Sequence, residues 1–158
     1  MMLSCQNPFA PAIDYNAGSS NTTLGDLKSI DGIFQNLQTA YTTKDTLIYG
    51  KLLSEDFSFS FRDYDQGFDV TWGRVEEMRI TSSLFQNSDR LNLIWNNDIL
   101  RSVADDSLSA QCVRAFNLVI VFNPSDVARV DGRVNLQFTR SSKAVGWKIT
   151  HWIDESNY

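Results

Sequence analysis

The side chains that could carry out chemistry are few, and only one of them is a histidine. His151 is the single histidine in the 158-residue chain. An imidazole titrates near neutral pH and is therefore a natural acid–base group. Alternation along GWKITHWIDE puts His151 on one side of an expected strand with Trp147 and Ile149. This pattern predicts a histidine at or in a pocket; the simpler alternative is a strand-end side chain satisfied by a neighbour or by water.

Carboxylates gather at two places in the sequence. Asp63, Asp65 and Asp69 surround a turn, but the segment lacks the spacing and terminal glutamate of an EF-hand loop, so solvation of a hairpin is favoured. Glu76 and Glu77 are adjacent, and adjacent helical residues do not face each other. Both fall in the first turn of an expected helix, where the helix dipole favours negative charge. We interpret them as capping residues, and the sequence predicts no catalytic residue and no metal site.

Composition limits the function classes further. The net charge is −5 and Lys and Arg are scattered, so the basic surface of a nucleic-acid-binding protein is missing. With 42% apolar and 21% charged residues, the chain has the composition of one globular domain. No phosphate-binding, dinucleotide or nucleophile-elbow motif is present, so no cofactor is expected. Cys112 begins an apolar run and is interpreted as a small buried hydrophobe.

The first half of the chain predicts helices and a hairpin. Apolar residues recur at helical spacing from Ser29 to Lys44, and Asp45 can cap a second, shorter helix. FSFSFR, residues 57–62, alternates as a strand and FDVTW can return as its hairpin partner. Residues 73–86 read as a third helix, with Val75, Met78, Ser82 and Phe85 on one stripe.

The second half predicts four strands. CVRAFNLVIVF is apolar on both parities, which indicates a central strand. VDGRVNLQFTR reads as one long, bent strand with a bulge at Asp131-Gly132. Helices that precede a mostly antiparallel sheet indicate the α+β class.

This order resembles the nuclear-transport-factor-2-like family, which includes ketosteroid isomerases and polyketide cyclases. The matching segments are AYTTKDTLIYGKLLSEDFSFSF, WGRVEEM, VNLQFTR and GWKITHWIDE, between Ser29 and Glu155. The resemblance implies a single cone-shaped α+β roll over residues 24–158, in which a curved, mostly antiparallel sheet wraps around three helices. It also implies a pocket between the helices and the concave face of the sheet.

Large aromatic residues are the expected lining of that pocket, with core packing as the alternative. The candidates are Phe59, Phe61, Trp72, Trp95, Phe116 and His151. Trp152 is expected on the outer face of the sheet with Thr150, together with Val119 and Val121. In the family that this chain resembles, such a covered outer face often forms a homodimer.

The beginning of the chain resembles a mature bacterial lipoprotein. Cys5 follows the small Ser4, with Met2 where such proteins usually have leucine, and the polar segment up to residue 23 contains two prolines and a Gly-Ser-Ser-Asn cluster. The resemblance implies lipid attachment at Cys5, a tether over residues 1–23 and a location in the bacterial cell envelope. If Cys5 is an ordinary residue, a cytoplasmic protein is the alternative.

Three functions remain open on this sequence. The first is a non-catalytic module that binds a small apolar ligand or a protein partner, with the membrane reached only through the lipid anchor. The second is a small enzyme of the isomerase, dehydratase or cyclase type. The third is a structural dimerisation module.

Overall fold

The computed structural model describes residues 23–155, so Cys5 and the predicted tether lie outside the described residues. The elements follow in the order α1 (Ile30–Thr43), α2 (Thr46–Leu52), β1 (Leu53–Asp63), β2 (Phe68–Gly73), α3 (Arg74–Asn87), β3 (Arg90–Val103), β4 (Ser109–Asn123), β5 (Asp126–Thr139) and β6 (Lys148–Asp154). The predicted order of helices and strands is confirmed. No described helix is long and apolar enough to cross a bilayer.

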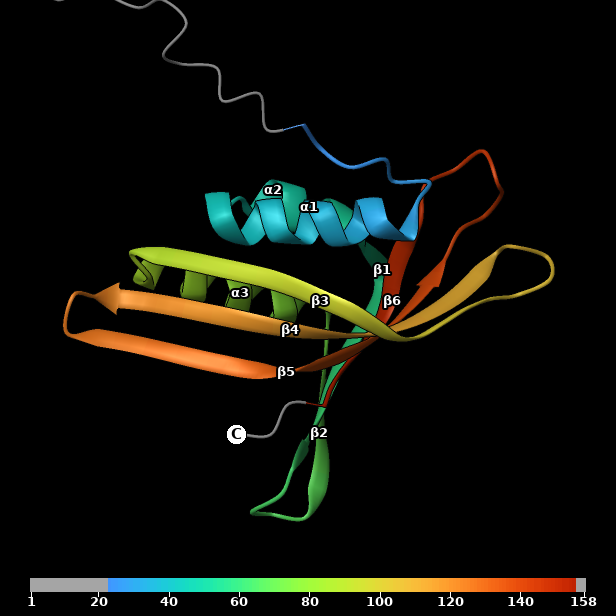
Figure 1. Cartoon of the computed structure of the whole chain (residues 1–158). Coiled ribbons are helices and arrows are strands. Elements are labelled where there is room, and N and C mark those ends of the chain that lie inside the picture. Colours follow the sequence, from blue (N-terminus) through green and yellow to red (C-terminus); the bar gives the residue numbers. More distant parts are fainter. Residues whose placement is uncertain (1–22, 156–158) are drawn as a thin grey trace, which may run out of the picture.

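One curved sheet holds all the described strands in the order β2-β1-β6-β5-β4-β3. Strands β1 and β6 pair in parallel, and every other neighbouring pair is antiparallel. Helices α1 and α2 lie together over one side of the sheet (Figure 1), and α3 packs against α2, β1 and β2. The α+β class and the roll of three helices against a curved sheet are therefore confirmed.

Short local signals begin and end the first two helices. Ser29 caps α1 by accepting a hydrogen bond from the backbone N–H of Gly32. Lys44 adopts the left-handed conformation and ends the helix. The side chain of Asp45 then accepts hydrogen bonds from the N–H groups of Leu47 and Ile48, as predicted for a cap of α2. Helix α2 packs against α1, and β1 follows it directly in the chain.

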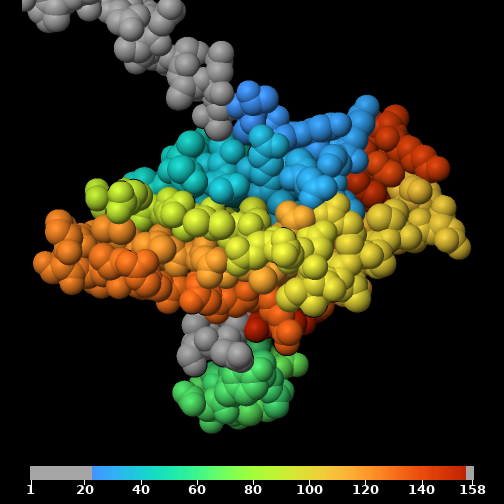
Figure 2. Space-filling view, viewed as in Figure 1, coloured from blue at the N-terminus to red at the C-terminus, as the bar shows by residue number. Residues whose placement is uncertain are grey.

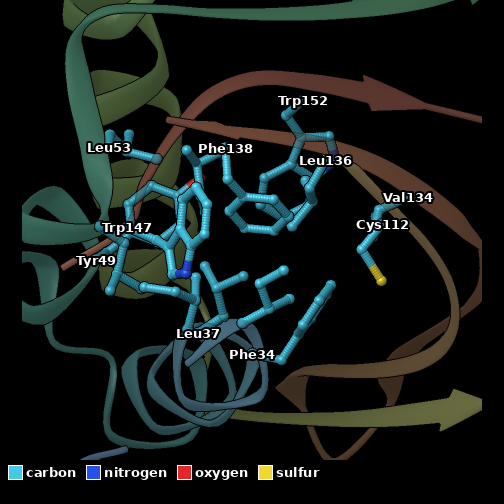
Figure 3. Close-up of a cluster of buried hydrophobic side chains, with 14 of the residues drawn as sticks. Phe34, Leu37, Tyr49, Leu53, Cys112, Val134, Leu136, Phe138, Trp147 and Trp152 are labelled. Carbon is cyan, nitrogen blue, oxygen red and sulfur yellow. The ribbon is translucent and has the colours of Figure 1, made fainter. Parts of the chain in front are cut away.

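The hydrophobic core fills the space between α1, α2 and the sheet (Figure 3). Phe34 and Leu37 of α1 are buried, and the Phe34 ring lies 6.2 Å from the ring of Phe138 on β5. Cys112 is fully buried in this core, as predicted, and its burial raises the pKa of the thiol to about 11. The core holds the helices firmly against one part of the sheet.

A bulge in β6 changes which side chains of this strand face inward. Gln137 pairs with His151 while the next residue of β5, Phe138, pairs with Ile149, so Thr150 is an extra residue. Ile149 and Trp152 are consequently both buried, and His151 is exposed. The predictions that His151 faces the pocket and that Trp152 faces outward are wrong, because strict alternation does not continue through a bulge.

Strand β5 is one long strand, as predicted, but it carries no bulge at Asp131-Gly132, where the pairing with β4 is regular. The β1–β2 hairpin projects from the body of the molecule (Figure 2). At its tip, Asp63 accepts hydrogen bonds from the N–H groups of Asp65 and Gln66. Across residues 23–155, no group of three or more His, Cys, Asp and Glu is placed to hold a metal ion.

Candidate functional site

A cavity of about 310 Å³ lies between α3 and the concave face of the sheet. Every strand and two of the helices contribute to its wall. The lining residues are Tyr41, Phe59, Trp72, Glu77, Ile80, Thr81, Leu84, Leu93, Trp95, Phe116, Leu118, Ile120, Val130, Val134, Trp152 and Asp154. The wall is therefore largely aromatic and aliphatic, with only a few polar groups, which is the usual character of a small-molecule site.

Aromatic rings form two sides of the cavity. On one side Trp72 stacks on Phe59 at 4.5 Å between ring centroids, with the two planes 11° apart, and the Phe59 ring lies 6.0 Å from Trp152. On the other side the rings of Trp95 and Phe116 meet edge to face at 6.1 Å. These pairs come from neighbouring strands, because cross-strand residues on one face of a sheet lie side by side.

Glu77 is a buried carboxylate of the cavity wall that accepts several hydrogen bonds. Its side chain is 5% exposed, and three hydrogen bonds reach it from three different elements. Oε1 accepts from the hydroxyl of Tyr49 on α2 at 2.5 Å and from the hydroxyl of Thr81 on α3 at 3.1 Å. Oε2 accepts from the indole N–H of Trp72 on β2 at 2.7 Å. Glu77 thus acts purely as an acceptor, which is the role of an ionised carboxylate.

Tyr49 keeps its proton in this arrangement. The residue is fully buried, and loss of water around the phenol raises its pKa well above the ordinary value of 10.0. The neighbouring negative charge of Glu77 acts in the same direction. The Tyr49 hydroxyl therefore remains a donor to Glu77 over the whole neutral range.

Two further polar groups belong to the last strand. Trp152 is 8% exposed, and its indole Nε1 is buried without a hydrogen-bond partner among the described residues. A buried donor that lacks an acceptor is uncommon and costs free energy, so it marks a position where a bound molecule can contribute. Asp154, two residues further on, adds a second carboxylate to the cavity wall.

The structure brings together four of the six residues that the sequence suggested as pocket lining. Phe59, Trp72, Trp95 and Phe116 all line the cavity. Phe61 packs edge to face against Trp72 at 5.7 Å but is not among the lining residues. The sixth candidate, His151, is exposed on the opposite face of the sheet because of the bulge in β6.

Glu76 and Glu77 both lie in the first turn of α3, as predicted, but the helix has no side-chain cap and Glu77 is a buried group of the cavity. Glu76 pairs with Arg79 at the surface, whereas Glu77 shares a buried face of α3 with Thr81 and Phe85. Val75, which the sequence placed on the buried stripe, is 85% exposed. Residues 77, 81 and 85 have the spacing of one helix face. A search for apolar residues at this spacing misses the face, because two of its three members are a glutamate and a threonine.

Comparison with known proteins shows the fold. No family model matches the chain, and no curated protein matches it in sequence. Among solved structures, a candidate scytalone dehydratase from Novosphingobium aromaticivorans has a TM-score of 0.69 and 11% identity, with 89% of each chain covered.

Two more solved structures agree with the first. A candidate dehydratase of the NTF2-like family from Streptomyces avermitilis has a TM-score of 0.63 and 15% identity, and the match covers 84% of this chain and 96% of that one. An NTF2-like protein of unknown function in nutrient uptake from Rhodospirillum rubrum has a TM-score of 0.64 and 16% identity. The match covers 82% of this chain and 99% of that one. The chain therefore has the nuclear-transport-factor-2-like cone fold, with the cavity between its helices and the concave face of its sheet.

Proposed function

We propose that this protein binds a small, largely apolar molecule in the cavity and that Glu77 holds the polar group of that molecule. The observation that carries the proposal is a buried, fully organised carboxylate in an otherwise apolar wall. A cavity of about 310 Å³ lies at the lower end of the range for ligand sites, so the ligand is small. Burial of its apolar surface supplies affinity, and Glu77 supplies orientation.

Glu77 retains the capacity for another hydrogen bond. An ionised carboxylate offers about four lone-pair positions, and the described donors occupy three of them, two on Oε1 and one on Oε2. The remaining position on Oε2 suits a donor of the ligand. The unpartnered N–H of Trp152 suits an acceptor of the same molecule.

The test is calorimetric titration of a small aromatic alcohol, 2-naphthylmethanol, into the wild-type protein and two variants of β5. Val130 lines the cavity, so Val130→Phe fills it and should reduce binding at least tenfold. Val127 is 45% exposed and pairs with Val121 on the outer face, so Val127→Phe is the matched control and should bind like wild type. Equal binding to wild type and Val130→Phe would contradict the proposal, as would a wild-type protein that binds neither this alcohol nor its ammonium analogue.

A second candidate function is catalysis of proton transfer in the same cavity. It is favoured by two carboxylates, Glu77 and Asp154, in one apolar wall, since general acid–base chemistry uses positioned groups of this kind. Two of the similar structures carry the description dehydratase. Incorporation of solvent deuterium into a small enolisable ketone, followed by NMR and lost in Glu77→Gln, would support this function. Absence of exchange above the rate in water would oppose it.

We also propose that Cys5 carries a lipid and tethers the domain at the bacterial cell envelope. The support is Ser4 before the cysteine and the polar segment with two prolines after it. Mass spectrometry of the protein from its native host should find a diacyl or triacyl addition on Cys5. An unmodified Cys5 would contradict the proposed lipid attachment.

A further inference from the structure

The charges of the cavity wall point to a particular class of ligand, and this inference rests on the proposed binding function. The wall contains the carboxylates of Glu77 and Asp154, and within residues 23–155 no Lys, Arg or His lines it. We propose that the ligand is an organic cation, a primary to tertiary ammonium group on a small apolar body, whose N–H can donate to Glu77. The aromatic rings and Glu77 form its binding site.

The hydrogen bonds of Glu77 leave its charge without a cationic partner among the described residues. Tyr49, Thr81 and Trp72 are all neutral donors. Arg74 begins the same helix, but its Nη2 donates to the carbonyl of Gly50 at 3.0 Å. Neutral donors orient and stabilise a carboxylate, yet the full charge remains inside a wall that is mostly hydrocarbon. A buried charge is costly unless a counter-charge accompanies it, so a cationic ligand gains more from this cavity than a neutral one.

The aromatic walls favour the same charge. The faces of Trp, Tyr and Phe rings carry negative electrostatic potential and attract cations, with Trp the most effective. Trp72, Trp95 and Trp152 all line the cavity. Trp72 and Trp152 flank Phe59 on one side, and Trp95 lies on the other side beside Phe116. Figure 3 shows Trp152 beside Leu136 in the cluster of buried side chains, and Trp152 is also a lining residue of the cavity.

Anionic ligands are disfavoured by the same features. A carboxylate or phosphate would meet two carboxylates, and apart from the neutral N–H of Trp152 the described lining residues offer it no favourable partner of opposite charge. A neutral molecule would bind by apolar burial and one hydrogen bond to Glu77. The expected order of affinity for ligands that share one ring system is therefore ammonium, then alcohol, then carboxylate.

The experiment compares three naphthalene derivatives by calorimetry at pH 7: 2-naphthylmethylammonium, 2-naphthylmethanol and 2-naphthoate. We expect the ammonium compound to bind the wild-type protein at least tenfold more tightly than the alcohol and the carboxylate to bind more weakly than both. In Glu77→Gln the ratio of ammonium to alcohol affinity should fall to within about threefold. In the control Glu76→Gln, which alters the exposed neighbour, the ratio should be that of wild type.

Each outcome decides one question. If the alcohol binds and the ammonium compound is no tighter, the cation inference is overturned while the proposed binding function stands. If none of the three compounds binds, both are overturned. Near-UV circular dichroism establishes whether Glu77→Gln is folded; if it is not, the order of the three compounds on wild type still tests the inference, because that order is set by the cavity alone.

Discussion

The hydroxyl of Tyr49 and Oε1 of Glu77 lie 2.5 Å apart, and this hydrogen bond joins α2 to α3 across 28 residues of sequence. One oxygen of the cavity carboxylate is thereby part of the structural core, since Tyr49 is fully buried. The other oxygen bonds to the wall residue Trp72. Glu77 is therefore both a connection between helices and a feature of the cavity, and its two roles can be separated by changing its partners.

Removal of the Tyr49 hydroxyl should destabilise the protein. In Tyr49→Phe the ring is retained but Glu77 loses one of three donors, so we expect a loss of about 1–3 kcal/mol in the free energy of unfolding. Urea denaturation measures this change. Tyr64→Phe is the control, because Tyr64 is 74% exposed at the hairpin tip and its change should be within about 0.5 kcal/mol. An equal effect of the two substitutions would show that the hydrogen bond contributes nothing.

The burial of Tyr49 also predicts that the free energy of unfolding falls at alkaline pH. Burial raises the pKa of Tyr49 in the folded state above the ordinary value of 10.0, so at higher pH the folded state holds a proton that the unfolded state has released. The free energy of unfolding should therefore fall as the pH rises above about 10. Tyr49→Phe should show a shallower fall between pH 9 and 11, measured by urea denaturation at each pH. Parallel pH profiles for the two proteins would contradict this assignment.

The ion pairs of Asp31 predict that the stability of the folded state decreases at acidic pH. The hydrogen bond from Arg101, with further contributions from Arg114, holds the pKa of Asp31 at about 2, below its ordinary value of 3.8. A carboxyl with a lowered pKa stabilises the folded state above the unfolded pKa, and this contribution decreases as the pH falls below about 4 and is lost only below about 2. Because Asp31 is 62% exposed, solvent screening limits the effect to at most about 1 kcal/mol.

Thermal unfolding of Asp31→Asn at pH 6 and at pH 1.5, below the folded-state pKa of Asp31, tests the assignment. The variant should differ from wild type at the higher pH and converge with it at the lower one. Asp105→Asn, which changes an exposed turn residue, should follow wild type at both values. A difference that persists at pH 1.5 would mean that Asp31 acts through something other than its charge.

Local patterns in the sequence predicted most of the fold. The helical spacing from Ser29 to Lys44, the cap at Asp45 and the alternation in residues 57–62 each reappear as α1, α2 and β1. These signals depend on neighbours a few residues apart, so a single sequence contains them. The aromatic lining was also partly predictable, because large aromatic residues on the concave face of a sheet are usually buried, either in the core or in the wall of a cavity.

The errors concern features that are set by distant partners. The bulge at Thr150 arises from the pairing of β6 with β5, and nothing in GWKITHWIDE interrupts its alternation. That single residue exchanges the positions of His151 and Trp152. Likewise, Glu77 is buried because Tyr49 and Trp72 supply its donors from other elements. A pattern of hydrophobicity cannot identify a buried charge whose partners are far away in sequence.

Gly32 should not tolerate a side chain. A Cβ atom at this position would lie 2.0 Å from the carbonyl oxygen of Asp26, where the segment before α1 crosses the helix. Glycine to alanine inside a helix normally stabilises by up to about 1 kcal/mol, so a loss in Gly32→Ala would identify the clash. We expect a loss of about 1–3 kcal/mol by urea denaturation. Gln38→Ala, at an exposed position of α1, should be close to neutral, and a stabilised Gly32→Ala would show that the segment moves aside easily.

The outer face of the sheet gives the last prediction, a homodimer. Asn96, Asn117 and Asp131 form a hydrogen-bonded ladder across β3, β4 and β5 on this face. Ile94 lies beside the ladder, is 47% exposed, and pairs with Asn117. Apolar residues around a satisfied polar ladder are suited to burial against a second copy of the same face. Sedimentation velocity should therefore find a dimer for wild type and a monomer for Ile94→Lys, whereas Val75→Lys, on the exposed side of α3, should remain dimeric. A wild-type protein that sediments as a monomer at all concentrations would remove both the predicted interface and the function as a dimerisation module.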